Sequence, residues 1–594
     1  MRVKVKSKQK LNKEGYVMKN SMKRKQMRSA VIILIAIVGL QLISFNTDAQ
    51  LDKEVVVRKL KQWEMTEAFK INLTPEIFDT ASYKPSFDYK IVPYQFKTEF
   101  KPEPIKPARM LPEPLSRHYG NYVMFGFGSD ISPQAEIKIN GTSKKKMAWG
   151  ADLKHHSSHG KFKINDLEYY PNFNTSSAAL FMNKHLKKNR IFDARIDLSS
   201  NGFKYYGYDI ENEIAPLTKD SLTKQNFTLI SGGIGLASNY ITKSKIKYDF
   251  DLDYYLLMDK EESREQALIL TAGLRDRFKS SIIGIDGSFG YYNNKFVADT
   301  FSNIYLMINP WVQRKGEDWK FIIGVNSYVK IDPDANSESY FYPNIQFEYD
   351  LADKFLQSYF GFTGHLEKNF FGELIEENPF VWSGFEASPT SVKKNIYAGF
   401  KGILTSKIKY NVKACYQEVK DAVLYVGVQD PTLFSGYRFM AEQHDLDKAS
   451  VFGEIAYQGN EKFEIHLSGS YYHYFTIKNE EYAYHMPDFD LSLRAAYNIQ
   501  KKIWITADLL VTGSRTAKII EYTTLANTDI NAVVTPDYLD LPVSSDLNLG
   551  VEYRYNKKVS GFLKVNNVLG SEYYNFNYYP AQRFHVTAGV IYAF

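Results

Sequence analysis

The sequence is nearly free of cysteine, because Cys415 is the only one among 594 residues. A single cysteine cannot close a disulfide within the chain, so the cross-links that stabilise many exported proteins are excluded. No cysteine lies near residues 47–50, where the leader described next ends, and this excludes the lipid attachment of a lipoprotein. We therefore expect another source of stability, such as a closed ladder of backbone hydrogen bonds.

Long apolar runs are also scarce. Residues 30–45 are largely apolar, follow a basic stretch and precede small residues at positions 47–49. This order predicts an export signal peptide over residues 1–49, with a long basic n-region. A run of 16 residues is shorter than the roughly 20 that a spanning helix needs. After residue 50 there is no run of 18 apolar residues, so no transmembrane helix is predicted.

Positive charge is missing once the leader is set aside. The whole chain carries a formal net charge of +7. Of its 74 basic and 67 acidic residues, 11 and 2 lie within residues 1–50, which leaves 63 and 65. A nearly neutral mature chain argues against a nucleic-acid partner, which an excess of basic residues would indicate.

Aromatic residues are abundant instead, with 44 Tyr and 40 Phe. They occur in segments that alternate apolar and polar side chains. In residues 246–256, for example, apolar or aromatic residues occupy the even positions, and Asp249, Asp251 and Asp253 lie between them. A period of two predicts β-strands with one apolar and one polar face. Most segments run about 9–13 residues, which suits tilted membrane strands better than the shorter strands of soluble sheets.

Counting these segments predicts an all-β fold, a transmembrane antiparallel up-and-down β-barrel of about 22 strands over residues 119–594. Short connections such as residues 459–461 alternate with long ones such as residues 421–447 and 513–542. Outer-membrane barrels have tight periplasmic turns and long external loops. The predicted strand centres are Val123, Glu136, Gly150, Phe181, Ala194, Gly233, Asp251, Ile269, Ile285, Met307, Gly324, Gln346, Phe360, Gly399, Val412, Glu454, Leu467, Leu493, Ala507, Leu549, Leu563 and Thr587.

The polar faces of these strands predict the lining of the lumen. The residues that we expect there are Asp249, Asp251, Asp253, Glu552 and Arg554. They form the ordinary wet interior of a large barrel, and they would influence solute passage.

The last segment ends on an aromatic residue. Residues 584–594 place Tyr592 and Phe594 on one apolar face, and the chain ends at Phe594. A terminal aromatic residue on an amphipathic closing strand is typical of the assembly signal of outer-membrane barrels. We predict that Tyr592 and Phe594 are recognised by the barrel insertion machinery.

Residues 565–594 carry Asn566 and Asn567, a Tyr-rich stretch, Tyr579-Pro580 and Arg583 before the final strand. This stretch resembles the closing hairpin of TonB-dependent receptors, and the resemblance extends over the barrel. Those receptors carry a folded plug before the barrel, whereas residues 50–118 are too few for one and become rich in proline. We expect a short extended periplasmic segment there, so the chain looks like a plugless subgroup.

The front of this segment offers a candidate contact. Glu54, Val55, Val56 and Val57 resemble a TonB box, in which an acidic residue is followed by β-branched residues. A partner would bind such a segment by strand addition. We predict TonB or another periplasmic or envelope protein as a partner of residues 51–118. The alternative is an ordinary short β segment.

Candidate catalytic and metal-binding residues are few. His155, His156 and His159 lie beside Ser157 and Ser158, but nothing in the sequence supplies the oriented third member that such catalysis requires. The glycine-rich residues 231–235 lie within a predicted strand, where glycine relieves crowding more often than it binds phosphate. We predict no enzyme activity, no metal and no cofactor.

Two functions remain open. The first is solute transport, since a 22-strand barrel encloses a wide lumen. The second is that of a structural barrel subunit in a larger envelope complex for outer-membrane protein assembly or export, which the missing plug favours. We favour transport, because more barrels of this size transport than scaffold. The expected place is the outer membrane of a diderm bacterium, in contact with its lipid, with both termini periplasmic.

Overall fold

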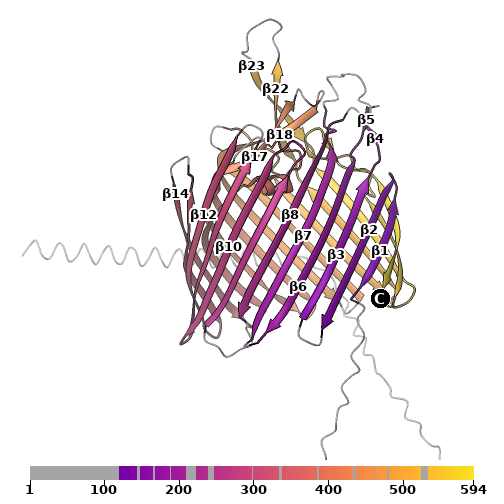
Figure 1. The fold of residues 1–594 in the computed structure, drawn as a ribbon. Coiled ribbons are helices and arrows are strands. Elements are labelled where there is room, and N and C mark those ends of the chain that lie inside the picture. The colour runs from indigo at the N-terminus through magenta and orange to yellow at the C-terminus, as the bar shows by residue number, and fades with distance from the viewer. Residues whose placement is uncertain are drawn as a thin grey trace, which may run out of the picture. The chain divides into compact units, whose positions relative to one another are not determined.

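A computed structural model describes residues 120–594 apart from short gaps (Figure 1). The predicted signal peptide, the predicted boundaries at residues 49 and 118, and Glu54, Val55, Val56 and Val57 lie outside the described residues. The gaps are residues 144–146, 165–166, 188, 209–221, 239–245, 297–298, 334–336, 384–386, 431–432, 434–435, 460–461, 478–479 and 524–532.

In the described residues, 24 strands hydrogen-bond into one sheet, and all but β22 and β23 form the barrel wall. The wall strands are β1 (Tyr122–Gly128), β2 (Ser132–Ser143), β3 (Met147–Ser158), β6 (Phe173–Leu186), β7 (Arg190–Lys204), β8 (Lys224–Ser238), β9 (Ile246–Met258), β10 (Arg264–Phe278), β11 (Ser281–Lys295), β12 (Thr300–Lys315), β13 (Trp319–Ile331), β14 (Glu338–Ala352), β15 (Leu356–Glu367), β16 (Thr390–Thr405), β17 (Ile408–Asp430), β18 (Gly436–Gly459), β19 (Phe463–Ile477), β20 (Phe489–Ile499), β21 (Ile503–Thr512), β24 (Ser544–Arg554), β25 (Val559–Asn566) and β28 (His585–Ala593).

The connections contain the remaining elements. They are β4 (Phe162–Ile164), β5 (Leu167–Tyr169), α2 (Phe371–Glu377), β22 (Arg515–Thr523), β23 (Val533–Leu541), β26 (Tyr574–Phe576) and β27 (Tyr579–Pro580). Among the described residues, no helix is long and apolar enough to cross a membrane.

Each wall strand pairs antiparallel with its neighbours along the wall, and β28 pairs with β1 from Tyr122↔Ala593 to Gly128↔Thr587. This last pairing closes the sheet, so no edge of the wall keeps a row of unpaired backbone groups. All 22 predicted strand centres fall within the wall strands. The predicted closed antiparallel barrel is confirmed.

The wall is apolar on its outer face. On β9, Phe250, Leu252 and Tyr254 are exposed, and the aspartates between them face the opposite side because successive side chains alternate across a strand. The same alternation on the other wall strands presents a continuous band of exposed aliphatic and aromatic side chains, as an outer-membrane barrel requires.

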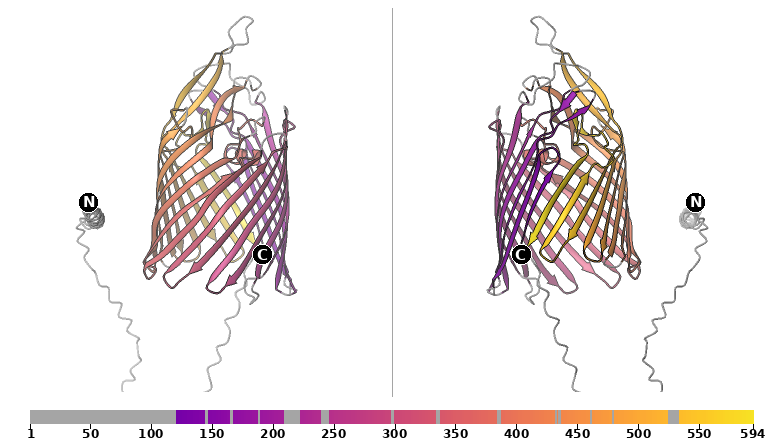
Figure 2. Two further views of the ribbon diagram at one scale, coloured as in Figure 1. Left: turned by 90° about the vertical axis from the view of Figure 1, so that its left-hand side faces the viewer. Right: turned by 90° about the vertical axis from the view of Figure 1, so that its right-hand side faces the viewer.

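The two ends of the barrel differ. At one end, here called the turn end, the strands join through tight turns, for example between Phe278 and Ser281. The other end, the loop end, carries the long connections, and the β22–β23 hairpin projects beyond the wall there (Figures 1 and 2). The alternation of short and long connections therefore agrees with the prediction. The chain end at Phe594 lies at the turn end.

Two predicted loops contain more structure than expected. Residues 421–447 lengthen β17 and β18 into strands of 23 and 24 residues, and residues 513–542 contain β22 and β23. Val426–Val428 of β17 pairs in parallel with Lys518–Ile520 of β22. In this extension both faces of β17 pack on protein, with Tyr425 in one buried cluster and Leu424 and Val426 in another. The apolar residues there are therefore continuous, and the alternation of the sequence is lost.

Candidate ligand chamber

The loop end contains a cluster of buried hydrophobic side chains contributed by four different connections. Its members are Tyr205, Val381, Tyr425, Leu433, Phe439 and Tyr579, and we call this cluster the loop cap. The six residues come from four separate parts of the sequence, so the cap joins the connections after β7, β15, β17 and β25. Burial of this many aromatic and aliphatic side chains is the main source of its stability.

Tyr579 is the centre of the loop cap. Its ring stacks on Phe380 with 3.6 Å between the ring centroids, and its hydroxyl donates to the Tyr437 carbonyl oxygen at 2.6 Å. The Tyr206 hydroxyl donates to the Pro580 carbonyl at 3.1 Å. The Tyr-Pro pair of the receptor-like closing hairpin therefore anchors the cap.

Backbone and charge contacts tie the β17–β18 hairpin to its neighbours. Val381 and Phe439 form an isolated parallel β-bridge. Arg438 is buried and forms ion pairs with Glu261 at 2.7 Å and with Asp430 at 2.8 Å. Its guanidinium carbon also lies 4.6 Å from the centroid of the Tyr205 ring. The connection between β9 and β10 is thereby joined to the cap.

Hydrogen bonds to one carboxylate hold helix α2 against the barrel wall. Glu265 near the start of β10 is fully buried, and it accepts hydrogen bonds from the Phe371 and Gly372 amides at 2.7 and 3.1 Å. The Tyr255 hydroxyl donates to the same carboxylate at 3.0 Å. An anion at a helix N-terminus satisfies free amides and interacts well with the helix dipole. Pro379 follows the helix and prevents its continuation.

Between the loop cap, α2 and the inner wall lies a cavity of about 1220 Å³, which we call the chamber. It is larger than the usual 300–1,000 Å³ of small-ligand pockets. Ser199 and Asn201 of β7 face it, and their neighbour Leu198 is exposed on the outer face. The residues lining it from the loop side include Glu373, Glu376, Glu377, Phe380 and Tyr579.

A smaller pocket of about 290 Å³ adjoins the chamber. Glu377, Asn575 and Phe576 line both cavities. His485, on the connection after β19, also lines the smaller pocket. Burial lowers the pKa of His485 to about 3, so its imidazole is neutral near neutral pH.

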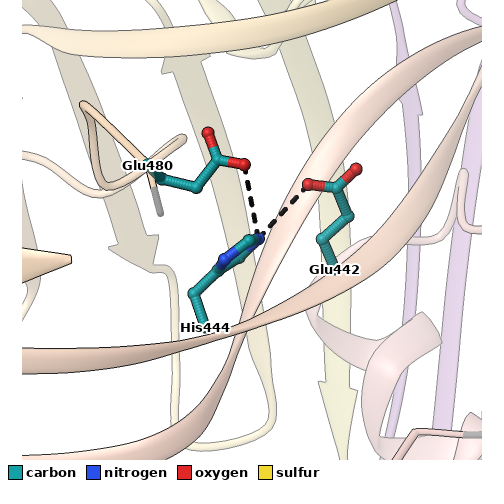
Figure 3. A group of neighbouring side chains, drawn as sticks. All are labelled: Glu442, His444 and Glu480. Carbon is teal, nitrogen blue, oxygen red and sulfur yellow. Dashed lines mark hydrogen bonds and ion pairs between the residues drawn. The ribbon is translucent and has the colours of Figure 1, made fainter. Parts of the chain in front are cut away.

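A second polar cluster lies outside these cavities. His444 Nε2 is 3.3 Å from Glu442 Oε2 and 3.7 Å from Glu480 Oε1 (Figure 3). A His and two carboxylates could hold a metal ion. However, the Lys518 ammonium lies 3.0 Å from the same Glu442 oxygen and 2.8 Å from the same Glu480 oxygen. We interpret the group as an ion-pair cluster that fastens β22 to the β17–β18 hairpin.

The predicted lumen residues on β9 lie beside glycines. Asp249, Asp251 and Asp253 pair across the ladders with Gly273, Gly235 and Gly233. A Cβ at each of these glycines would lie 2.2–2.5 Å from a carboxylate oxygen of the paired aspartate. Glycines in residues 231–235 therefore leave space for carboxylates, which agrees with the expectation that glycine relieves crowding there.

The other predicted residues are spread over the barrel. Arg554 and Glu552 pair at 2.9 Å near the turn end, away from the chamber. Tyr592 and Phe594 are both exposed, and their rings stack with centroids 6.0 Å apart. Their role in assembly stays a prediction.

The histidine and serine group near the end of β3 makes local contacts. His155 Nδ1 lies 2.9 Å from Ser176 Oγ, and His155 Nε2 lies 3.3 Å from Ser157 Oγ. His156 packs edge-on against Phe173, and the Ser158 hydroxyl accepts a hydrogen bond from the Gln582 side chain at 3.0 Å. These contacts stabilise the junction of the wall with the β25–β28 connection.

Sequence reasoning missed the residues that line the chamber and the residue that holds α2 beside it. Glu265 occupies an ordinary polar position at a strand end, and Asn172 lies between the predicted strand centres Gly150 and Phe181. Nothing in the local pattern marks either residue, because their neighbours come from distant parts of the chain. A buried carboxylate becomes recognisable only when the helix that it caps is in place.

No protein-family model and no curated protein matches the sequence. Solved structures do match it in fold. The iron transporter FrpB from Neisseria meningitidis gives a TM-score of 0.63 at 10% identity, with 81% of this chain and 82% of that chain covered. The ferric-catecholate import receptor Fiu from E. coli K12 gives 0.59 at 10% identity, with 80% and 82% covered. The siderophore receptor PirA from Acinetobacter baumannii gives 0.59 at 10% identity, with 80% of each chain covered.

Identities of this size establish the fold alone. The barrel has the architecture of outer-membrane receptors of the TonB-dependent kind, as the resemblance of the closing hairpin predicted. The predicted lack of a plug concerns residues 50–118, which lie outside the described residues.

Proposed function

We propose that this protein is an outer-membrane barrel that takes up a solute through its lumen, with the loop end outside and both termini in the periplasm. The observation that carries the proposal is the chamber of about 1220 Å³ between the loop cap and the inner wall. A purely structural barrel has no need of a large polar and aromatic cavity beneath packed loops. Transport receptors bind their solute in such a place before passing it inward.

The partners in this proposal follow from the sequence. The exposed apolar band contacts outer-membrane lipid, and the insertion machinery engages the strand that ends at Tyr592 and Phe594. Residues 51–118 remain the segment through which TonB or another periplasmic or envelope protein would act. The polar lumen residues Asp249, Asp251 and Asp253 would line the path of the solute.

The test is permeation through the lumen after the loop cap is opened. Tyr579→Ala removes the central ring of the cap, and cells producing this variant without residues 51–110 should admit a large antibiotic that the intact outer membrane excludes. Adding Ser199→Trp places a large ring in the chamber and should slow the admission of the antibiotic. Adding Leu198→Trp places the same ring on the outer face and should not.

The competing function is that of a structural subunit. If the correctly inserted barrel with Tyr579→Ala and without residues 51–110 admits no more antibiotic than the barrel that lacks residues 51–110 alone, uptake through the lumen is overturned. The structural alternative is then favoured. Heat-modifiable migration in gels confirms that each variant has inserted as a barrel.

A further inference from the structure

The charge of the chamber restricts what it can bind. Four carboxylates line it, from Glu373, Glu376, Glu377 and Asp546. Among the described lining residues, Arg583 is the one Lys or Arg side chain, and it already pairs with Glu572 at 2.8 Å. A cavity lined mainly by one sign of charge repels solutes of that sign. An anionic ferric chelate is therefore a poor match for this chamber.

Two lining side chains have unused hydrogen-bonding atoms. Asn172 is 6% exposed, and neither its amide nitrogen nor its amide oxygen has a hydrogen-bond partner. Asp546 Oδ1 is also buried without a partner. Leaving such groups buried and unpaired is unfavourable, so a bound solute that pairs with them is stabilised. Asn172 needs an acceptor and a donor side by side, and a hydroxyl group is both.

The walls of the chamber supply aromatic surface between these polar groups. Phe173, Phe203, Tyr206 and Phe576 line it. Flat rings of this kind bind a solute that has an apolar face and a polar rim. The ring of a sugar has this shape, because its C–H bonds form a face and its hydroxyls form the rim.

The adjoining pocket extends the same chemistry. Its His485 is neutral, so its imidazole offers one donor and one acceptor, as a hydroxyl partner requires. Phe576 and Asn575 form the boundary between the two cavities. A linear solute of several similar units would occupy both.

We propose that the chamber and the adjoining pocket bind a neutral oligosaccharide, with Asn172 as the residue that pairs with its hydroxyls. This inference rests on the proposed function and names the solute class of the same cavity. It separates this protein from the structures that it matches in fold, whose names refer to iron and to a ferric catecholate. Carboxylates accept hydrogen bonds from hydroxyls, so the acidic lining contributes to binding such a solute.

The test is calorimetric binding to the purified full chain in detergent. The probes are neutral gluco-, xylo-, manno- and galacto-oligosaccharides of four to six sugars. Oligogalacturonates of the same length test the effect of charge, and a ferric tris-catecholate tests the chelate. We expect a neutral oligosaccharide to bind at least about 10-fold more tightly than either anion. The inference is overturned if no neutral probe binds, or if an anion binds as tightly.

Substitution of Asn172 separates recognition from folding. Asn172→Leu keeps the size of the side chain and removes two unpaired polar groups, so the thermal midpoint should stay equal or rise while affinity falls at least about 10-fold. Asn294→Leu is the matched control, because Asn294 is also 6% exposed and has an unpartnered oxygen, but it does not line the chamber. Unchanged affinity in the Asn172→Leu variant contradicts the assignment.

The failure of this inference differs from a failure of the proposed function. If the Tyr579→Ala barrel admits the antibiotic but no neutral probe binds, the oligosaccharide proposal is refuted and the uptake proposal stands. If a neutral oligosaccharide binds in a manner that depends on Asn172 but the barrel never admits the antibiotic, the binding site is supported and the uptake proposal is refuted.

Discussion

Replacing Glu265 by glutamine should loosen α2 from the barrel wall. The carboxylate accepts the Phe371 and Gly372 amides and the Tyr255 hydroxyl. An amide of the same size keeps one acceptor oxygen and turns an NH2 group toward one of the three donors. Burial raises the pKa of Glu265 to about 7, so above that pH one hydrogen bond to a charged group is lost and one donor is left buried without a partner.

The expected cost is about 2 kcal/mol, taken from the usual 1.5–3 kcal/mol for a hydrogen bond to a charged group. At about 1.4 kcal/mol for each factor of ten, the local opening of α2 should become roughly 30-fold more frequent. Because α2 carries Glu373, Glu376 and Glu377 into the chamber, the same change should widen the lumen and increase single-channel conductance.

Hydrogen–deuterium exchange measures this directly. Amides of residues 371–377 in the Glu265→Gln variant should exchange roughly 30-fold faster, while amides in the middle of β10 keep their rate. Glu262→Gln, an exposed glutamate three residues earlier, is the matched control and should change neither quantity. Equal protection of α2 in the variant and the unaltered barrel would refute the anchoring role of Glu265.

Three further predictions concern topology, assembly and pH. With cysteine introduced in a cysteine-free background at exposed Tyr538 of β23 or at exposed Tyr555 near the turn end, a membrane-impermeant maleimide should label intact cells only at Tyr538→Cys. The reverse pattern inverts the orientation. Phe594→Asp should be exported but inserted poorly, because a charge replaces the aromatic terminus of the closing strand; normal amounts of heat-modifiable barrel contradict this. Hydrogen bonds from Lys518 and Tyr484 outweigh burial, which acts in the opposite direction, and lower the pKa of Glu480 below its ordinary value of 4.5. The contact of β22 with the β17–β18 hairpin should therefore be fully formed above about pH 4.5 and weaken as the pH falls through the lowered pKa. Lys518→Met should remove this pH dependence of hydrogen exchange in β22, and an unchanged profile would exclude the ion pair as its cause.

The barrel was predictable because its signal is local. Each wall strand has lipid on one face and a wet lumen on the other, so apolar and polar residues alternate along the strand and indicate which side chain faces which side. This is why the centres from Val123 to Thr587 all fall within strands. Closure through β1 and β28 follows from the same alternation, since an unpaired strand edge is not tolerated in lipid.

The alternation disappears in the long connections beyond the wall, and there the sequence no longer predicts strands. Residues 423–428 are almost continuously apolar, and the sequence alone does not distinguish a loop from the long β17–β18 hairpin that the structure contains. The hairpin exists because it packs on α2 and on the connection that carries Tyr579, and because the edge of β17 pairs with β22.

The sequence by itself determined the class of barrel, the number of its strands and the residues on each face, because those depend on neighbours one and two positions away. Only the tertiary structure decided the loop cap, the chamber and the neighbours of Asn172. The Glu265 carboxylate meets the Phe371 amide across 106 positions, and the Tyr579 hydroxyl meets the Tyr437 carbonyl across 142. Contacts over such separations leave no periodic pattern, because they are set by how the connections pack over the lumen once the wall has closed.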